Sequence, residues 1–188
     1  MRRVAAPLTA MGATLETSAQ GGLPMTIRGG ALQGITWHSE HASAQVKSAI
    51  LLAGLVADVP VEVHERAATR DHTERMLRAR GIDVRSEGTS VALVPGAPLA
   101  SVDTDVPGDP SSATFFAALA AMAGGGTLEL EQVGVNPTRT GAFDVLARMG
   151  ATVGYEDLAD AGGEPVARLV VSPRILGATV IEPHEVPS

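Results

Sequence analysis

Two nearly uncharged apolar stretches organise the chain, one from Ser43 to Ala57 and one from Ser112 to Ala123. Lys47 is the only charge in the first stretch, and the second has none. A helix that is apolar nearly all round is expected in a protein interior. We therefore predict two interior helices with sheets outside them, which inverts the usual arrangement of helices covering a parallel sheet.

The same succession of shorter segments follows each apolar stretch, and it predicts a unit of helix, strand, helix, strand and strand. In the first complete copy these elements are Ser43–Ala57, Val59–Val63, Thr69–Arg80, Ile82–Arg85 and Ser90–Val94. In the next copy they are Ser112–Ala123, Thr127–Leu130, Thr138–Met149, Thr152–Tyr155 and Arg168–Val171. The residues before Ser43 predict only the back half of a unit, with a helix ending near Met11 and strands at Thr14–Thr17 and Met25–Arg28.

A fixed interval of 69 residues relates the copies. It separates the glycines Gly12, Gly81 and Gly150, and also the leucines four residues before them, Leu8, Leu77 and Leu146. Glycine directly after a helical pattern is typical of a helix C-terminus. A constant interval of this length predicts a repeat architecture of the α/β class. Because the first unit is truncated and Glu182–Ser188 resembles an exposed tail, we expect an internal fragment of a longer protein.

Composition narrows the possible partners. A net charge of −7 without a basic cluster argues against nucleic acid and against an anionic membrane surface, so an anionic ligand must be held locally. The chain has no cysteine, which excludes disulfides within it and is compatible with a cytoplasmic location. The uncharged run Ala49–Ala57 is too short to span a bilayer. We expect small-molecule partners, and neither nucleic acid nor a membrane.

Two predicted helix starts carry the groups that bind phosphate. Ser43 and Gln45 stand at one start, where backbone N–H groups and a hydroxyl are available. Thr69 and Arg70 stand at the other, where a guanidinium can bind two phosphate oxygens at once. The alternative is structural, since serine and threonine at helix starts commonly serve as caps.

Four segments closely resemble the 5-enolpyruvylshikimate-3-phosphate synthase family: Ser43–Leu55, Thr69–Leu77, Val106–Ala113 and Asn136–Gly141. The resemblance covers essentially the whole chain, but the chain covers less than half of such an enzyme. It implies a two-domain enolpyruvyl transferase fold of repeated units. It also implies transfer of the enolpyruvyl group of phosphoenolpyruvate to shikimate 3-phosphate, on the way to chorismate and aromatic amino acids. No cofactor or metal is implied, and a cytoplasmic monomer is expected of the full-length enzyme.

The resemblance also assigns binding residues. Ser43 and the backbone around Ala44 are expected to bind the phosphate of shikimate 3-phosphate, and Gln45 to reach its ring and the phosphoenolpyruvate side. Thr69 stands where the family has a phosphate-binding serine, and Arg70 is expected to be a second phosphate ligand. The family's catalytic acids and bases have no counterpart here, so we expect no catalytic residue in this chain and no turnover by it alone.

Domain boundaries follow from the same resemblance. Residues 1–107 are expected to belong to the shikimate-3-phosphate-binding domain and residues 108–188 to the second domain, with Gly108 at the crossing. In the second domain, Asp109, Ser111 and Ser112 are expected to cap a helix. Arg139 matches Arg70 by interval and is either a ligand or part of a structural ion pair.

Other polar residues are more simply interpreted as structural or surface residues. Lys47 is expected to reach solvent or to pair with a carboxylate. His72 either approaches the pocket or is an exposed helix residue. The remaining histidines lack metal-ligand spacing: His38, His41, His64 and His184. Two alternative functions remain, an enolpyruvyl transferase acting on UDP-N-acetylglucosamine and a non-catalytic repeat module that binds a phosphorylated metabolite.

Overall fold

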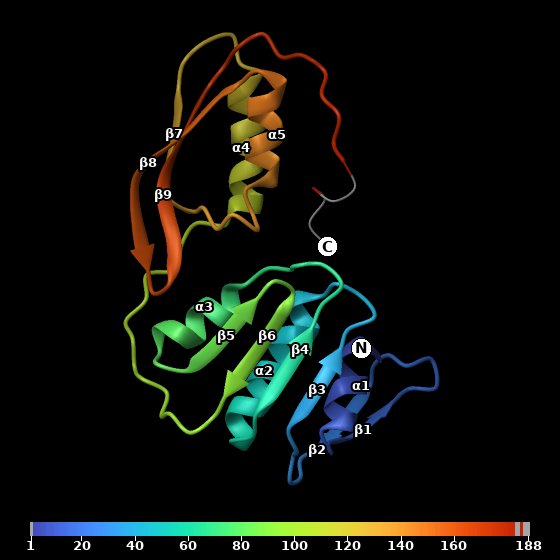
Figure 1. Cartoon of the computed structure of the whole chain (residues 1–188). Helices are drawn as coiled ribbons and strands as arrows, with labels where there is room; N and C mark the ends of the chain where they lie inside the picture. Colours follow the sequence, from blue (N-terminus) through green and yellow to red (C-terminus); the bar gives the residue numbers. More distant parts are fainter. Residues whose placement is uncertain (1, 183–184, 186–188) are drawn as a thin grey trace. The chain divides into compact units, whose positions relative to one another are not determined.

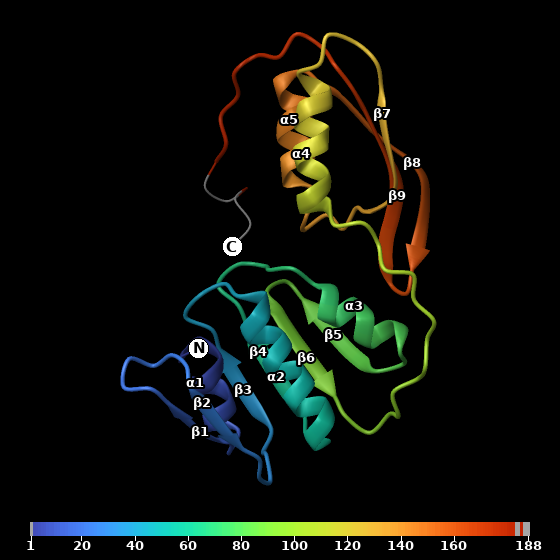
Figure 2. The same cartoon turned by 180° about the vertical axis from the view of Figure 1, so that it is seen from behind.

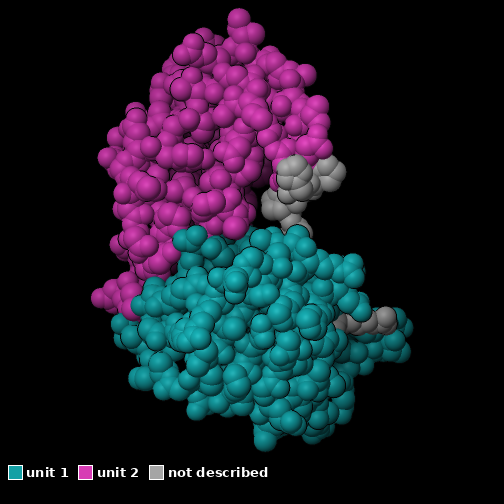
Figure 3. Space-filling view, in the orientation of Figure 1, with its two compact units in different colours: residues 1–101, 188 teal, residues 102–187 magenta. Residues whose placement is uncertain are grey.

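The chain forms two compact units, and the division between them falls after Ser101 (Figure 3). The structure is a computed structural model that describes residues 2–182 and 185. The sequence predicts the boundary a few residues later, between residues 107 and 108, and this domain boundary stays a prediction. Gly108 belongs to the second unit, because its N–H donates to the Gln132 carbonyl at 2.7 Å and its carbonyl accepts from Gly134 at 2.9 Å. The assignment of the units to the family's domains stays a prediction.

The first unit contains a half repeat and one complete repeat (Figure 1). Its elements are α1 (Arg2–Ala10), β1 (Thr14–Thr17), β2 (Met25–Arg28), β3 (Ile35–His38), α2 (Ala44–Ala57), β4 (Val61–His64), α3 (His72–Ala79), β5 (Asp83–Glu87) and β6 (Ser90–Val94). Strands β1 and β2 form an antiparallel pair. The other four strands form one sheet in the order β3-β4-β6-β5, in which only the β3–β4 pair is parallel.

The core of this unit lies between the sheet and α2, which crosses one face of it (Figure 2). Val61 and Val63 of β4 are buried, whereas Glu62 between them is half-buried, so strand alternation directs the apolar side chains toward the helix. A Cβ added to Gly54 of α2 would lie 2.8 Å from the Val61 methyl groups. Glycine at this position therefore permits the close approach of α2 to β4.

The second unit repeats the complete motif. Its elements are α4 (Pro110–Ala121), β7 (Leu128–Gly134), α5 (Gly141–Met149), β8 (Thr152–Ala161) and β9 (Glu164–Ser172). The sheet order is β7-β9-β8 with antiparallel pairs, which matches β4-β6-β5 element for element. The predicted repeat of helix, strand, helix, strand and strand is confirmed.

The interval of 69 residues has a backbone explanation. Gly12, Gly81 and Gly150 all have φ between 81° and 113°, in the left-handed region that favours glycine. In every copy the glycine N–H donates to the carbonyl three residues back, and the next N–H donates to the carbonyl of the repeated leucine. This pair of bonds is a Schellman motif, and it closes α1, α3 and α5 in the same way.

Several strand predictions needed correction. Strand β3 (Ile35–His38) was not predicted. Strands β8 and β9 extend to a hairpin turn at Gly162 and Gly163, both with positive φ, well beyond the predicted Thr152–Tyr155 and Arg168–Val171. Residues 156–160 are exposed in this hairpin, so no buried face marked them as strand in the sequence.

Neither apolar helix is buried all round. Along α2, Val46, Lys47, Ile50, Leu51 and Gly54 are buried, whereas Leu52 and Val56 are exposed. Along α4, Ala113, Ala117 and Ala121 are buried, whereas Phe115, Phe116 and Leu119 are exposed. The prediction that both helices are interior nearly all round was therefore wrong, since each of them buries one face.

None of the helices in residues 2–182 has the length and apolar character needed to cross a bilayer.

Replacing Gly81 by alanine tests the backbone explanation of the repeat. The added Cβ would meet nothing within 4 Å, so only the positive φ of +81° opposes it. Gly81→Ala is expected to lower the free energy of unfolding of the first unit by about 1–2 kcal/mol. The measurement is urea unfolding followed by the fluorescence of Trp37, the single tryptophan.

The matched control is Gly29→Ala. A methyl group added at Gly29 would also meet nothing within 4 Å, but Gly29 lacks a positive φ. Its substitution is expected to change stability by less than about 0.5 kcal/mol. Equal costs for the two alanine variants would contradict the assignment of Gly81 as a required left-handed helix terminus.

Candidate functional site

The beginning of α2 leaves a hydroxyl and backbone N–H groups available. Ser43 is the N-cap residue with φ −153° and ψ 104°, and its carbonyl accepts from Val46 and Lys47. Its side chain makes no capping hydrogen bond. The alternative that Ser43 serves as a side-chain cap is thus wrong. No acidic residue lies in the first turn of α2, where one would offset the positive end of the helix dipole.

Two open cavities adjoin this helix beginning, and Ser43 lies in the wall of both. Their volumes are 320 and 440 Å³. Arg3 of α1 and Val46 of α2 also line both, and Gln45 lines the larger one. The cavities therefore bring a guanidinium, a hydroxyl and an amide together at the positive end of α2.

Residues that the sequence did not identify complete the cavity walls. They are Arg3, Val4, Ala6, Gln20, Gly21, Trp37, Ser39, Glu40 and His41. Four of them, Trp37, Ser39, Glu40 and His41, lie on β3 or in the segment between β3 and α2. The alternation of apolar and polar residues in Ile35–His38 is a strand signal, and it would have placed Ser39–His41 beside Ser43.

The segment before α3 is arranged differently from the sequence prediction. Helix α3 begins at His72 with Asp71 as its N-cap, so Thr69 does not cap it. The Thr69 hydroxyl is buried and donates to the Glu65 carboxylate at 2.6 Å. Arg70 is half-buried, and its Nε is buried without a hydrogen-bond partner among the described residues. In the described chain neither Thr69 nor Arg70 lines the two cavities.

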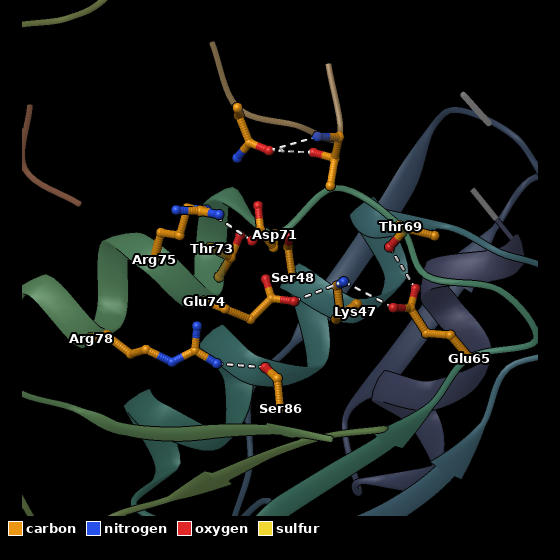
Figure 4. A network of polar contacts seen from close by, with 12 residues as sticks. Lys47, Ser48, Glu65, Thr69, Asp71, Thr73, Glu74, Arg75, Arg78 and Ser86 are labelled. Carbon is orange, nitrogen blue, oxygen red and sulfur yellow. Dashed lines mark hydrogen bonds and ion pairs between the residues drawn. The ribbon is translucent and has the colours of Figure 1, made fainter. Parts of the chain in front are cut away.

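A buried ionic cluster connects the two helix beginnings (Figure 4). The Lys47 ammonium lies 2.9 Å from Glu65 Oε2 and 2.7 Å from Glu74 Oε1. All three side chains are only 2% exposed. A hydrogen bond of 2.7 Å between the hydroxyls of Ser48 and Thr73 adds a second link between α2 and α3. The first turns of the two helices are thus held together, as the phosphate hypothesis requires.

The secondary candidates mostly have structural roles. Lys47 pairs with carboxylates and does not reach solvent. His72 is exposed at the beginning of α3 and lines neither cavity. Among the described residues, no group of three or more histidine, aspartate, glutamate or cysteine side chains has the geometry of a metal site. His184 lies outside the described residues.

The second copy has a capped helix in place of an open one. Asp109 is the N-cap of α4 and accepts from the backbone N–H groups of Ser111 and Ser112. The Ser112 hydroxyl also donates to it, and Arg139 lies 3.2 Å away. The Ser112 hydrogen bond is the main cause that lowers the pKa of the Asp109 carboxyl. Arg139 thus forms an ion pair, and capping by Asp109 is confirmed.

Comparison with known proteins gives concordant matches. Residues 1–180 match the family described as EPSP synthase (3-phosphoshikimate 1-carboxyvinyltransferase). The chain is 50% identical over all 188 residues to the 3-phosphoshikimate 1-carboxyvinyltransferase of Alkalilimnicola ehrlichii, of which it covers 42%. It is 48% identical to that of Desulforudis audaxviator and covers 44% of it. The chain therefore spans less than half the length of these relatives.

Solved structures confirm the fold. An EPSP synthase from Acinetobacter baumannii is 49% identical, with a TM-score of 0.83 over 92% of this chain and 39% of that one. The enolpyruvyl transferase NikO from Streptomyces tendae has a TM-score of 0.66 at 16% identity, over 92% of this chain and 42% of that one, and so supports the fold alone. The predicted α/β fold of the enolpyruvyl transferase type is confirmed.

Removing the Asp109 cap tests its electrostatic role. A lowered pKa in the folded state means that the ionised carboxylate stabilises the fold above the ordinary carboxyl pKa of about 4, and that this stability is lost as the pH falls through the folded pKa. Asp109→Ala is expected to cost the second unit about 1 kcal/mol at pH 7 and clearly less at pH 2. Amide hydrogen exchange in α5 at the two pH values measures both costs.

Asp103→Ala serves as the control, because Asp103 is exposed and lies outside any helix or strand. Its effect is expected to be small at both pH values. A cost for Asp109→Ala that stayed constant from pH 7 to pH 2 would show that charge plays no part in this cap.

Proposed function

Because the chain belongs to the EPSP synthase family, we propose that it supplies the phosphate-binding side of a shikimate 3-phosphate site. The activity of the complete enzyme would be transfer of the enolpyruvyl group of phosphoenolpyruvate to that substrate, in chorismate and aromatic amino acid biosynthesis. The observation that carries the proposal is the uncapped beginning of α2, with Ser43 in the wall of two cavities.

Charge considerations favour an anionic ligand at this place. The chain is acidic overall, so a phosphate cannot be attracted by its net charge and must be held by local groups. The α2 beginning offers the Ser43 hydroxyl and the backbone N–H of Ala44, at the positive end of a 14-residue helix. Arg70 adds a guanidinium whose buried Nε has no partner within the described protein. A buried donor without a partner is costly, and a phosphate oxygen would remove this cost.

The remaining residues have distinct proposed roles. Gln45 is exposed in the wall of the larger cavity, where its amide can reach ring hydroxyls of the substrate. Thr69 is the weakest member of the set, because its hydroxyl proton is already donated to Glu65. It can still accept a hydrogen bond, but it cannot at the same time donate to phosphate.

The proposed contribution of these residues is binding rather than proton transfer. We propose no catalytic acid or base, cofactor or metal among them. The match to 3-phosphoshikimate 1-carboxyvinyltransferases favours this function over one with UDP-N-acetylglucosamine. A cytoplasmic location and a monomeric state stay predictions.

Titration calorimetry of the chain with shikimate 3-phosphate tests the proposal. Arg70→Ala is expected to weaken binding by about tenfold or more, because it removes a charge-assisted hydrogen bond to phosphate. Gln45→Ala is expected to weaken it by about two- to tenfold, in line with loss of neutral hydrogen bonds.

Arg66→Ala is the matched control. Arg66 is an exposed arginine in the same segment and carries the same charge, so its loss reports only the general electrostatic effect. Affinity within about twofold of wild type is expected for it. Binding that is equally weakened by Arg66→Ala and Arg70→Ala would contradict a specific phosphate site. Absence of binding by the unmodified chain would leave only a packing role for these helix beginnings.

A further inference from the structure

The buried cluster of Lys47, Glu65 and Glu74 has no part in the proposed ligand contacts, yet it lies between them. Two carboxylates share one ammonium in an environment that is almost closed to solvent. Glu74 Oε2 is buried and has no hydrogen-bond partner within the part of the chain that the structure describes. Such a cluster is an expensive way to hold two helices together, because burying charges costs more than burying apolar groups of similar volume.

The repeat shows that the fold itself does not require these charges. Helix α4 contains no charged residue, and Phe143 stands at the interval-matched position of Glu74. Phe143 is 1% exposed and belongs to the apolar core of the second unit. The same arrangement of helix, strand, helix, strand and strand is thus built there with apolar side chains.

Glu65 is the member of the cluster that touches both halves of the candidate site. Its Oε1 accepts from Thr69, the residue before Arg70. Its Oε2 accepts from Lys47, whose backbone N–H donates to the carbonyl of Ser43 at 3.2 Å. One carboxylate therefore connects the segment that carries the guanidinium to the turn that carries the serine hydroxyl.

We propose that Glu65 is a positioning residue, which fixes the backbone at Arg70 relative to the beginning of α2 so that both can contact one phosphate. This inference rests on the proposed function. In this role the carboxylate does not touch the ligand, because its side chain is only 2% exposed and its negative charge would repel a phosphate. It acts on the ligand through Arg70.

The test is a double-mutant cycle on shikimate 3-phosphate affinity, measured at a temperature at which circular dichroism shows every variant folded. Glu65→Gln is expected to bind about tenfold more weakly than wild type, a loss typical of a charged hydrogen-bonding partner. In the Arg70→Ala background the same substitution is expected to change affinity by less than about twofold, because the group through which Glu65 acts is gone. Glu62→Gln, three residues away on β4 and partly exposed, is expected to match wild type.

A second variant covers the case in which Glu65→Gln does not fold. Thr69→Val preserves side-chain shape and the Lys47 ion pairs but removes the hydrogen bond to Glu65. It is expected to weaken binding about threefold in the wild-type background and to have no effect in the Arg70→Ala background. If Thr69 instead contacted the phosphate directly, Thr69→Val would weaken binding in both backgrounds.

The outcomes separate this inference from the proposed function. Suppose that Arg70→Ala weakens binding while Glu65→Gln and Thr69→Val leave it at the wild-type level. This result would overturn the positioning role of Glu65 but not the proposed function. Effects of Glu65→Gln that are equal with and without Arg70 would also overturn it. A wild-type chain that does not bind shikimate 3-phosphate would overturn both.

Discussion

The position of one ammonium group governs the arrangement of the candidate site. Lys47 lies between Glu65 and Glu74 at hydrogen-bonding distances, and none of the three side chains reaches solvent appreciably. Attraction between such groups is strong in a low-dielectric interior, and so is the penalty for leaving any one of them unpaired. The two helix beginnings are therefore constrained to one relative arrangement. A purely apolar contact would instead allow the helices to slide past each other.

The features that recur in every copy and the features that differ between copies have different physical causes. Schellman motifs at Gly12, Gly81 and Gly150 recur because each copy needs the same chain reversal after a helix. The helix beginnings differ, since α4 is capped by Asp109 whereas α2 is left uncapped at Ser43. An open helix beginning costs stability, and it is retained in the copy that also carries the buried ions and the cavities. This combination is the one expected if the α2 beginning binds a ligand, as we propose.

Sequence reasoning recovered the features that depend on local pattern. The interval of 69 residues located the unit and its order, because glycine with positive φ and buried leucine are dictated by short-range geometry. Sequence reasoning missed β3, although its residues alternate between apolar and polar, and with it the cavity wall beside Ser43. It could not assign the partners of Lys47 and Thr69, since Glu65 and Glu74 meet them only through tertiary packing. The resemblance named the candidate site residues, and the structure supplied the buried network that we propose arranges them.

The free energy of unfolding of Lys47→Met, followed by Trp37 fluorescence, tests most directly whether the buried ammonium holds the first unit together. Loss of about 3–5 kcal/mol is expected, because two buried carboxylates are left uncompensated. The triple variant Lys47→Met, Glu65→Gln, Glu74→Gln should recover most of this loss, since no charge then remains buried. A cost below about 1 kcal/mol for Lys47→Met, or no recovery in the triple variant, would contradict the account.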